Sequence, residues 1–374
     1  MIYTTLFTAA LAISGTAVAS PMKNNHNHLP PNSGAGIPPK KHSNFPPNSV
    51  ADVVPPKENN DLPPSGDTDA PPAFDGKYTS LKGWAKGHGR YWGTAVDPPI
   101  LKNTAMADFI AKEFNQVTPE NSMKWAETEP HPGKFDFAAA DEVVKFAQKH
   151  GMEIRGHCLL WHKQAPAWVY QIKDPDEMAE AIRRHITAVV GRYKGIIKVW
   201  DVVNEIFEQD GSFRHSVFYR LLGEKFVHIA FEAANKADSD AALYINDFNL
   251  DAPNAPKTLA MIAKVKGWRN ANVAITGIGS QSHIEQGGGK RHAAALKAMS
   301  AVVPEVAITE LDIPNAPSQD YVDVVKGCLV LKNCVGITSW GACDKVSWLP
   351  GKSPLLFDGQ MRPKEAYKAI MSSL

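Results

Sequence analysis

The chain has 374 residues, of which 44% are hydrophobic and 9% aromatic, so it can bury a sizeable core in one large domain or two ordinary ones. Its 40 Lys and Arg residues nearly balance its 39 Asp and Glu residues. Binding to nucleic acid or to an anionic membrane requires a strong basic excess, so this balance supports neither partner and is compatible with a neutral polymer.

The first residues carry the pattern of a secretory signal. An apolar stretch is followed by Ala17-Val18-Ala19, a small-x-small cleavage pattern. The stretch is too short to cross a bilayer, and no stop-transfer segment follows it. We therefore predict a signal peptide over residues 1–19, a secreted, extracellular protein and no membrane partner.

Residues 20–75 differ from the rest of the chain in composition and contain a repeat. Diprolines recur every eight or nine residues, each after an apolar residue; they start at Pro30, Pro38, Pro46, Pro55, Pro63 and Pro71. One apolar side chain per repeat cannot build a core, so we predict a disordered arm with polyproline character. The arm would be a semi-rigid spacer, or its apolar residues would dock on a wall polymer or a partner protein.

From residue 76 to residue 374 the sequence alternates between two patterns. Eight runs are expected to be strands: 90–96, 114–120, 153–161, 198–205, 242–248, 274–283, 306–313 and 335–341. Between them, apolar residues at spacings of three and four predict helices, for example over 140–151, 177–193, 223–237 and 256–268. Gly151 and Gly267 stand where helix C-caps are expected.

This alternation predicts an α/β fold, a (β/α)8 TIM barrel, as the single domain of residues 76–374. A doubly wound open sheet would more often show a Gly-rich phosphate turn after its first strand, and the sequence has none there.

The four cysteines are candidates for disulfides in a secreted protein. Cys328 and Cys334 would close a short loop between a helix and a strand. Cys158 and Cys343 lie in apolar runs far apart in the sequence and are interpreted as buried small hydrophobes.

Polar and aromatic residues follow the predicted strands at their C-terminal ends, where the active site of a barrel enzyme lies. They are Glu120, Asn121, His157, Trp161, Asn204, Glu205, Asn246, Asp247, Gln281, His283, Glu310, Asp312 and Trp340. Paired carboxylates with abundant Trp favour glycoside hydrolysis, in which two carboxyl groups flank the bond and sugar faces stack on indole rings. A metal site built from His157, His283, Glu310 and Asp312 is a weaker alternative, and we expect neither a metal nor a cofactor.

The strand period suggests how the carboxyl groups work. Residues two apart share a face, so a chain of contacts from Asp312 through His283 to Glu310 is feasible and would keep Glu310 ionised as a nucleophile. Glu205 would then be the acid and later the base. Because Asn204 and Glu205 are neighbours, a regular pleat would send them to opposite faces, and we expect a bulge or irregular turn there.

Six segments, in this order, resemble glycoside hydrolase family 10: "TPENSMKW" (118–125), "GHCLLWH" (156–162), "WDVVNE" (200–205), "GIGSQSH" (277–283), "ITELDI" (308–313) and "CVGITSWGACDKVSWL" (334–349). The resemblance covers essentially all of residues 76–374. The family comprises retaining endo-β-1,4-xylanases on a (β/α)8 barrel, so the resemblance implies an enzyme that cleaves xylan.

The resemblance also implies roles for individual residues. Glu205 would be the acid/base and Glu310 the nucleophile, with support from His283, Asp312 and Asn204. Substrate contacts would come from Glu120, Asn121, Lys124, His157, Trp161, Gln164, Gln281, Trp340 and Trp348. The spacing of Cys328 and Cys334 matches a disulfide common in fungal members.

Other interpretations stay open at this point. Within the same fold, a β-1,4-glucanase or a mixed xylanase/cellulase is the nearest alternative, although bulky indoles at Trp340 and Trp348 would exclude the hydroxymethyl group of glucose. A non-catalytic glycan-binding protein would tolerate the loss of a carboxylate, and both glutamates are present. A surface protein acting through the Pro-rich arm is a third possibility, and a monomer is the default expectation.

Overall fold

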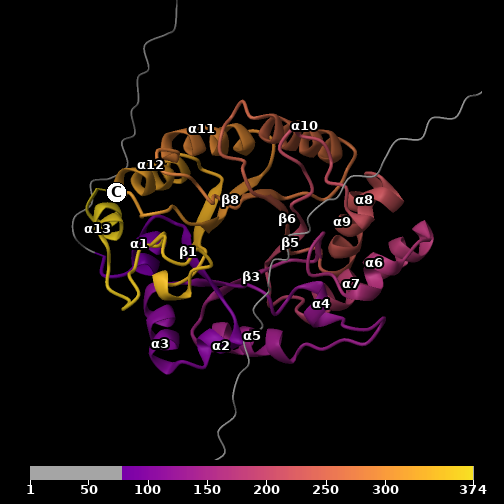
Figure 1. The fold of residues 1–374 in the computed structure, drawn as a ribbon, viewed down its shortest axis with the longest axis horizontal. Helices are drawn as coiled ribbons and strands as arrows, with labels where there is room; N and C mark the ends of the chain where they lie inside the picture. The colour runs from indigo at the N-terminus through magenta and orange to yellow at the C-terminus, as the bar shows by residue number, and fades with distance from the viewer. Residues whose placement is uncertain (1–77, 374) are drawn as a thin grey trace, which may run out of the picture. The chain divides into compact units, whose positions relative to one another are not determined.

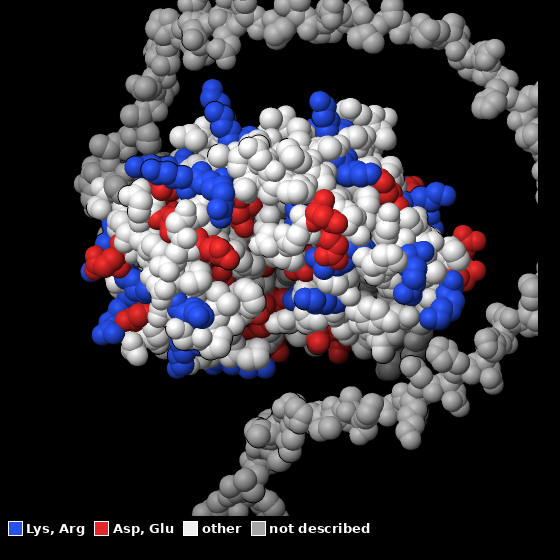
Figure 2. Space-filling view, turned by 45° about the horizontal axis from the view of Figure 1, so that its top comes forward, with Lys and Arg blue, Asp and Glu red and all other residues white. Residues whose placement is uncertain are grey.

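The computed structural model of the protein describes residues 78–373. The predicted signal peptide and Pro-rich arm lie outside these residues. Within 78–373, no helix is both long enough and apolar enough to cross a bilayer. Basic and acidic side chains are interspersed over the face shown in Figure 2.

A closed sheet of parallel strands forms the centre of the fold (Figure 1). Its strands are β1 (Tyr91–Val96), β2 (Gln116–Pro119), β3 (Glu153–Gly156), β4 (Leu160–Trp161), β5 (Val199–Asn204), β6 (Ala242–Asp247), β7 (Gly277–Ser280), β8 (Glu305–Leu311) and β9 (Cys334–Ser339). The sheet closes because β1 pairs with both β2 and β9, and β5 pairs with both β3 and β6. Because β3 and β4 are two pieces of one barrel strand, these nine segments form the predicted eight-stranded barrel, which is confirmed.

The third barrel strand is interrupted, whereas the sequence predicted one strand over 153–161. Both β3 and β4 pair with β5, so they are two pieces of one barrel strand. The peptide bond between His157 and Cys158 is cis and lies in the gap between the two pieces. His157 and Trp161, on either side of this gap, both line the same cavity.

Helices surround the barrel on its outside (Figure 1). The longer ones are α1 (Leu81–Gly87), α3 (Thr104–Glu113), α5 (Ala138–Lys149), α7 (Pro175–Arg192), α9 (Lys225–Ala237), α10 (Pro256–Asn270), α11 (Gly289–Ser300), α12 (Ser318–Leu329) and α13 (Glu365–Ser373). Shorter helical turns are α2 (Pro98–Leu101), α4 (Trp125–Thr128), α6 (Ala167–Gln171), α8 (Val217–Leu222) and η1 (Asp344–Val346).

Helix α7 shows how the sequence sets these elements. The side chain of Asp174 accepts a hydrogen bond from the backbone N–H of Glu177, and Pro175 occupies the first helical position. Residues at spacings of three and four then turn inward, and Ile182 and Ile186 are fully buried. The helix is thus fixed by its cap at one end and by its apolar face along its length.

One predicted helix end is correct and the other is wrong. Gly151 follows α5 with φ +62°, a conformation that favours glycine. Gly267, in contrast, lies inside α10, which continues to Asn270 because Trp268 still packs into the core with 5% of its surface exposed. Asn272, with φ +60°, makes the turn in its place.

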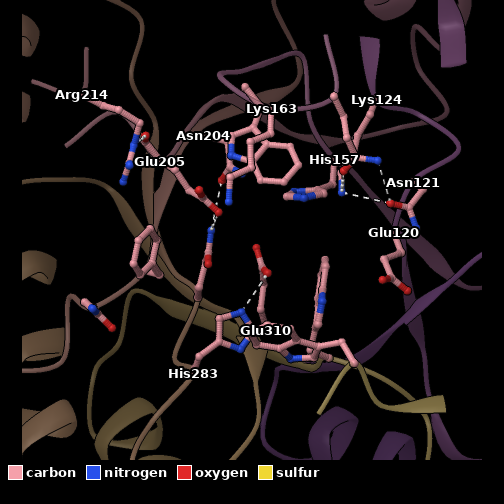
Figure 3. Close-up of a pocket in the computed structure, with 17 residues that line it drawn as sticks. Glu120, Asn121, Lys124, His157, Lys163, Asn204, Glu205, Arg214, His283 and Glu310 are labelled. Atoms are coloured by element: carbon pink, nitrogen blue, oxygen red, sulfur yellow. Dashed lines mark hydrogen bonds and ion pairs between the residues drawn. The ribbon is translucent and has the colours of Figure 1, made fainter. Parts of the chain in front are cut away.

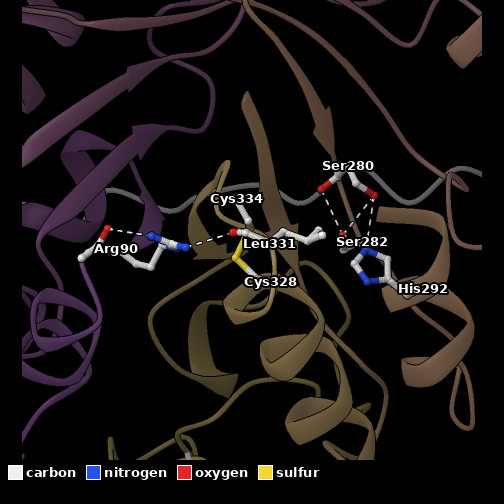
Figure 4. The surroundings of a disulfide bond; sticks show 8 residues. Arg90, Ser280, Ser282, His292, Cys328, Leu331 and Cys334 are labelled. Carbon is white, nitrogen blue, oxygen red and sulfur yellow. Dashed lines mark hydrogen bonds between the residues drawn. A yellow bond between two sulfur atoms is a disulfide. The ribbon is translucent and has the colours of Figure 1, made fainter. Parts of the chain in front are cut away.

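The predicted disulfide is present and ties a helix to a strand (Figure 4). It joins Cys328 in the last turn of α12 to Cys334 at the start of β9, and both side chains are buried. Nearby, the guanidinium of Arg90 donates a hydrogen bond of 3.0 Å to the carbonyl of Leu331 in the same connection. Cys158 and Cys343 are unpaired and buried, as predicted.

Replacing both Cys328 and Cys334 with Ser should lower the free energy of unfolding by about 2 kcal/mol, because the bond restricts a short loop in the unfolded chain. The melting temperature, followed by circular dichroism, should fall by several degrees. As a control, reductant should lower the melting temperature of the unmodified protein and leave that of the double variant unchanged. Equal melting temperatures for the two proteins without reductant would contradict the prediction.

Candidate active site

A cavity of about 520 Å³ opens where the strands end (Figure 3). All predicted site residues line it except Asp312, which lies behind His283. These are Glu120, Asn121, Lys124, His157, Trp161, Gln164, Asn204, Glu205, Gln281, His283, Glu310, Trp340 and Trp348. Sequence reasoning missed four lining residues: Lys163, Arg214, Phe248 and Asn249.

Glu310 is a buried carboxylate held by a cation. Its side chain is 6% exposed, and its Oε2 lies 3.3 Å from Nε2 of His283. The other ring nitrogen of His283 lies 3.0 Å from Oδ1 of Asp312. Burial would lower the pKa of His283, but the two carboxylates raise it to about 10, so the ring is an imidazolium at neutral pH.

The imidazolium in turn stabilises the Glu310 anion. Burial alone would raise the pKa of Glu310, but the hydrogen bond with His283, together with the nearby His157 ring and the positive charge of His283, brings it below the ordinary value. Asp312 is anchored from its other side, because the indole Nε1 of Trp348 donates a hydrogen bond of 2.6 Å to Oδ2. The predicted chain of contacts is therefore present and extends to Trp348.

Asn246 is a further partner of Glu310. Its Nδ2 donates to Oε1 of Glu310 at 2.9 Å and to Oδ1 of Asn204 at 3.0 Å. Its Oδ1 accepts from the hydroxyl of Thr309 at 2.7 Å, which fixes the orientation of the amide. Asn246 was visible in the sequence as a strand-end residue, but nothing there showed that it contacts a carboxylate.

Glu205 lies across the cavity from Glu310 in a different setting (Figure 3). Its Oε1 accepts a hydrogen bond of 3.3 Å from Nε2 of Gln281. Its Oε2 is 3.9 Å from Nδ1 of His162. Burial and nearby cations lower the pKa of His162 to about 4, so the ring is neutral above that pH. Only loosely tied, the Glu205 carboxyl can approach a bound molecule.

The backbone at Glu205 is irregular, as expected. Strand β5 ends at Asn204, and Glu205 has φ +55°, in the left-handed region that non-glycine residues seldom adopt. The left-handed backbone of Glu205 breaks the pleat, so the side chains of Asn204 and Glu205 both line the cavity.

Polar contacts also order one wall of the cavity. Nζ of Lys124 donates to Oε1 of Gln164 at 2.8 Å and lies 4.6 Å from the ring centre of Trp161. The carboxylate of Asp97, which sequence reasoning missed, accepts hydrogen bonds from the backbone and side-chain nitrogens of Asn121. Burial, followed by the charge of Asp97, raises the pKa of Glu120.

His157 is oriented from below by a buried ion pair. Its Nδ1 lies 2.9 Å from Oδ2 of Asp201, and the Arg155 guanidinium contacts the same carboxylate. Arg155 and Asp201 are at most 2% exposed. Since Asp201 is on β5 and Arg155 on β3, the pair also links two barrel strands.

Asp247, a strand-end residue to which the family resemblance gives no role, does not line the cavity. It is fully buried, with Nζ of Lys257 2.7 Å from Oδ1. Its other oxygen accepts a hydrogen bond of 3.2 Å from the backbone N–H of Phe207. Burial raises its pKa to about 6.

The four missed lining residues differ in how visible they were. Phe248 was the last residue of the strand predicted over 242–248 but was not identified as a site residue, and Asn249 follows it directly beyond the end of β6. Lys163 and Arg214 lie in loops, and Arg214 is nine residues beyond Glu205, the last residue of the predicted strand.

Among residues 78–373, no group of three or more His, Cys, Asp and Glu side chains is arranged to hold a metal ion.

The geometry agrees with what comparison with known proteins finds. Residues 80–373 match the model of glycosyl hydrolase family 10. This chain belongs to that family. The family resemblance seen in six sequence segments is thereby confirmed.

Relatives and solved structures of the family cover most of the chain. Endo-1,4-β-xylanase 2 of Claviceps purpurea is 61% identical over 295 residues, which are 79% of this chain and 91% of that relative. Endo-1,4-β-xylanase 3 of Hypocrea jecorina is 52% identical over 76% of this chain and 82% of its own length. Xylanase 10B of Thermotoga petrophila, solved in complex with xylobiose, has a TM-score of 0.73 at 32% identity and matches over 79% of this chain and 96% of its own.

Replacing His283 with Asn should raise the pKa of Glu310, because the carboxylate would lose its cation while remaining buried. A ¹³C NMR titration of protein labelled at glutamate carboxyl carbons would follow it, with Glu310→Gln identifying the resonance. The exposed His228 on α9 supplies the control variant His228→Asn, which should leave this pKa unchanged. An unaltered Glu310 titration in His283→Asn would show that the imidazolium does not stabilise the anion.

Proposed function

We propose that the protein is a retaining endo-1,4-β-xylanase, with Glu310 as nucleophile and Glu205 as acid/base. The observation that carries the proposal is the pairing of two unlike carboxyl groups across one cavity, one held ionised by His283 and the other loosely tied. The similarity to endo-1,4-β-xylanases supports xylan as the substrate.

The reaction would proceed in two displacements. In the first, Glu310 bonds to the anomeric carbon as the glycosidic C–O bond breaks, and Glu205 gives its proton to the leaving oxygen. In the second, the Glu205 carboxylate takes a proton from water while the water oxygen bonds to the same carbon and Glu310 leaves. Two inversions give net retention.

Other cavity residues would bind the sugar around this centre. Amide and cationic groups on the wall of Asn121, Lys124 and Gln164 would contact hydroxyl groups. Trp340, 8% exposed, and Trp348, 53% exposed, would cover the sugar at the cleavage point. Indoles there would leave little room for the hydroxymethyl group of glucose, which favours xylan over cellulose.

The direct test incubates the protein with xylan and with carboxymethyl-cellulose and follows the anomers of the first products by ¹H NMR. The proposal predicts β-configured xylo-oligosaccharides from xylan and much slower release from carboxymethyl-cellulose. Initial α-configured products would refute retention, and inactivity on xylan would refute the substrate.

The same assay tests the acid/base residue. Glu205→Gln should lower kcat/KM on xylan by about 10²–10⁴-fold, the usual contribution of a general acid. The matched control is Glu232→Gln on the surface of α9, where the side chain is 54% exposed and outside the cavity. Full activity of Glu205→Gln would remove this residue from the mechanism.

We also propose that the protein is secreted, with a signal peptide at residues 1–19, an arm at 20–75 and the catalytic domain at 76–374. The small-x-small pattern and the disulfide support this. N-terminal sequencing of protein from the culture medium of a fungal expression host should find a chain that begins at Ser20, or later if the arm is trimmed. A chain retained in the cells with Met1 in place would contradict secretion.

A further inference from the structure

Glu205 sits at a strained point of the chain that needs support. Its N–H continues the sheet by donating a hydrogen bond of 2.9 Å to the carbonyl of Asn246. Beyond that bond the backbone leaves the sheet, since φ is +55° and β5 has already ended. A non-glycine residue stays in this region only where its surroundings hold it. A hydrogen bond to the carbonyl of Glu205 can hold the backbone in this conformation as it leaves the strand.

Arg214 holds that carbonyl. Its Nε donates to the Glu205 oxygen at 2.9 Å, and its Nη2 donates to the carbonyl of Phe207 at 3.2 Å. Its Nη1 lies 3.2 Å from a carboxylate oxygen of Glu208. Because the guanidinium is planar and rigid, its two carbonyl bonds fix Glu205 and Phe207 relative to each other.

The loop that carries Arg214 is itself closed. The N–H of Arg214 donates to the carbonyl of Ile206 at 2.8 Å, and Phe207 and Phe213 form a β-bridge. The buried Asp247 accepts from the N–H of Phe207, which ties the loop to the end of β6. Arg214 is thus a fixed part of a small folded unit that begins at Glu205.

Arg214 lines the cavity, so it could instead bind a sugar. Each of its three guanidinium nitrogens, however, already contacts an acceptor within the protein. Only 18% of its side chain is exposed. These contacts favour a role toward Glu205 over a role toward the substrate.

We propose that Arg214 is a positioning residue for Glu205. By bonding the carbonyl of Glu205 it keeps this residue left-handed, and so keeps its carboxyl on the cavity side, where it can protonate the glycosidic oxygen. If the residue relaxed to extended backbone, the pleat would turn the carboxyl away from the face occupied by Asn204. The proposal rests on the proposed function of Glu205 as acid/base.

The test compares two aryl β-xylobiosides, one with phenol and one with 2,4-dinitrophenol as the leaving group. Phenol needs a proton to depart and dinitrophenol does not, so the pair reports acid catalysis separately from binding and nucleophilic attack. Arg214→Gln should lower kcat/KM on the phenyl substrate at least about tenfold and change that on the dinitrophenyl substrate by no more than about twofold. The ammonium of Arg214→Lys can replace only some of the guanidinium hydrogen bonds, so its kcat/KM on the phenyl substrate should lie between those of Arg214→Gln and the unmodified enzyme.

Two further variants make the result decisive. Glu208→Gln removes the ion pair while leaving both carbonyl bonds of Arg214, and should behave as the unmodified enzyme on both substrates. Glu205→Ala should show the same leaving-group selectivity as Arg214→Gln, only more strongly.

Equal losses on both substrates in both Arg214 variants, or no loss in either, would overturn the positioning role. If Glu205→Ala nonetheless lost more activity on the phenyl than on the dinitrophenyl substrate, the proposed function would stand without a positioning role for Arg214. If Glu205→Ala showed no selectivity, the acid/base assignment would fail and this proposal with it. Circular dichroism melting curves identify a variant that has not folded, in which case Arg214→Lys decides the question.

Discussion

The burial of the Glu310 carboxylate is the constraint around which the site is built. An ion removed from water costs several kcal/mol unless partners replace its hydration. Here the replacement comes from His283 and Asn246, and His283 needs Asp312, which is held by Trp348. These partners belong to or follow the neighbouring strands β6, β7, β8 and β9, so the anion is accommodated only when these strands are assembled side by side.

The second carboxyl group depends on the backbone more than on charge. Glu205 has an amide donor from Gln281 and a neutral His162 nearby, and no cation of the described chain lies in an ion pair with its carboxyl. Its placement comes from the left-handed backbone of Glu205 itself, directly after the end of β5. Two carboxyl groups in one cavity are thereby given unlike surroundings, which is how one fold can supply both an anion and a proton donor.

The fold could be predicted in detail because each strand carries its own local signal. The strand ends also identified most of the cavity lining, because a parallel barrel gathers the C-terminal ends of its strands at one face. What escaped prediction depends on tertiary contacts: Asn246 was noticed but not connected to Glu310, and Arg214 lies in a loop with no periodic pattern. Gly267 was misread as a helix end because the burial of Trp268, which prolongs α10, is not visible from the sequence.

The central claim is that the His283-stabilised Glu310 carboxylate attacks the anomeric carbon. It is tested most directly by trapping the covalent intermediate with 2,4-dinitrophenyl 2-deoxy-2-fluoro-β-xylobioside, whose fluorine slows the second displacement. Mass spectrometry of the intact protein and of its peptides then locates the added sugar. The account predicts one fluoroxylobiosyl group per molecule, on Glu310. Labelling of another residue, or turnover with no adduct, would contradict it.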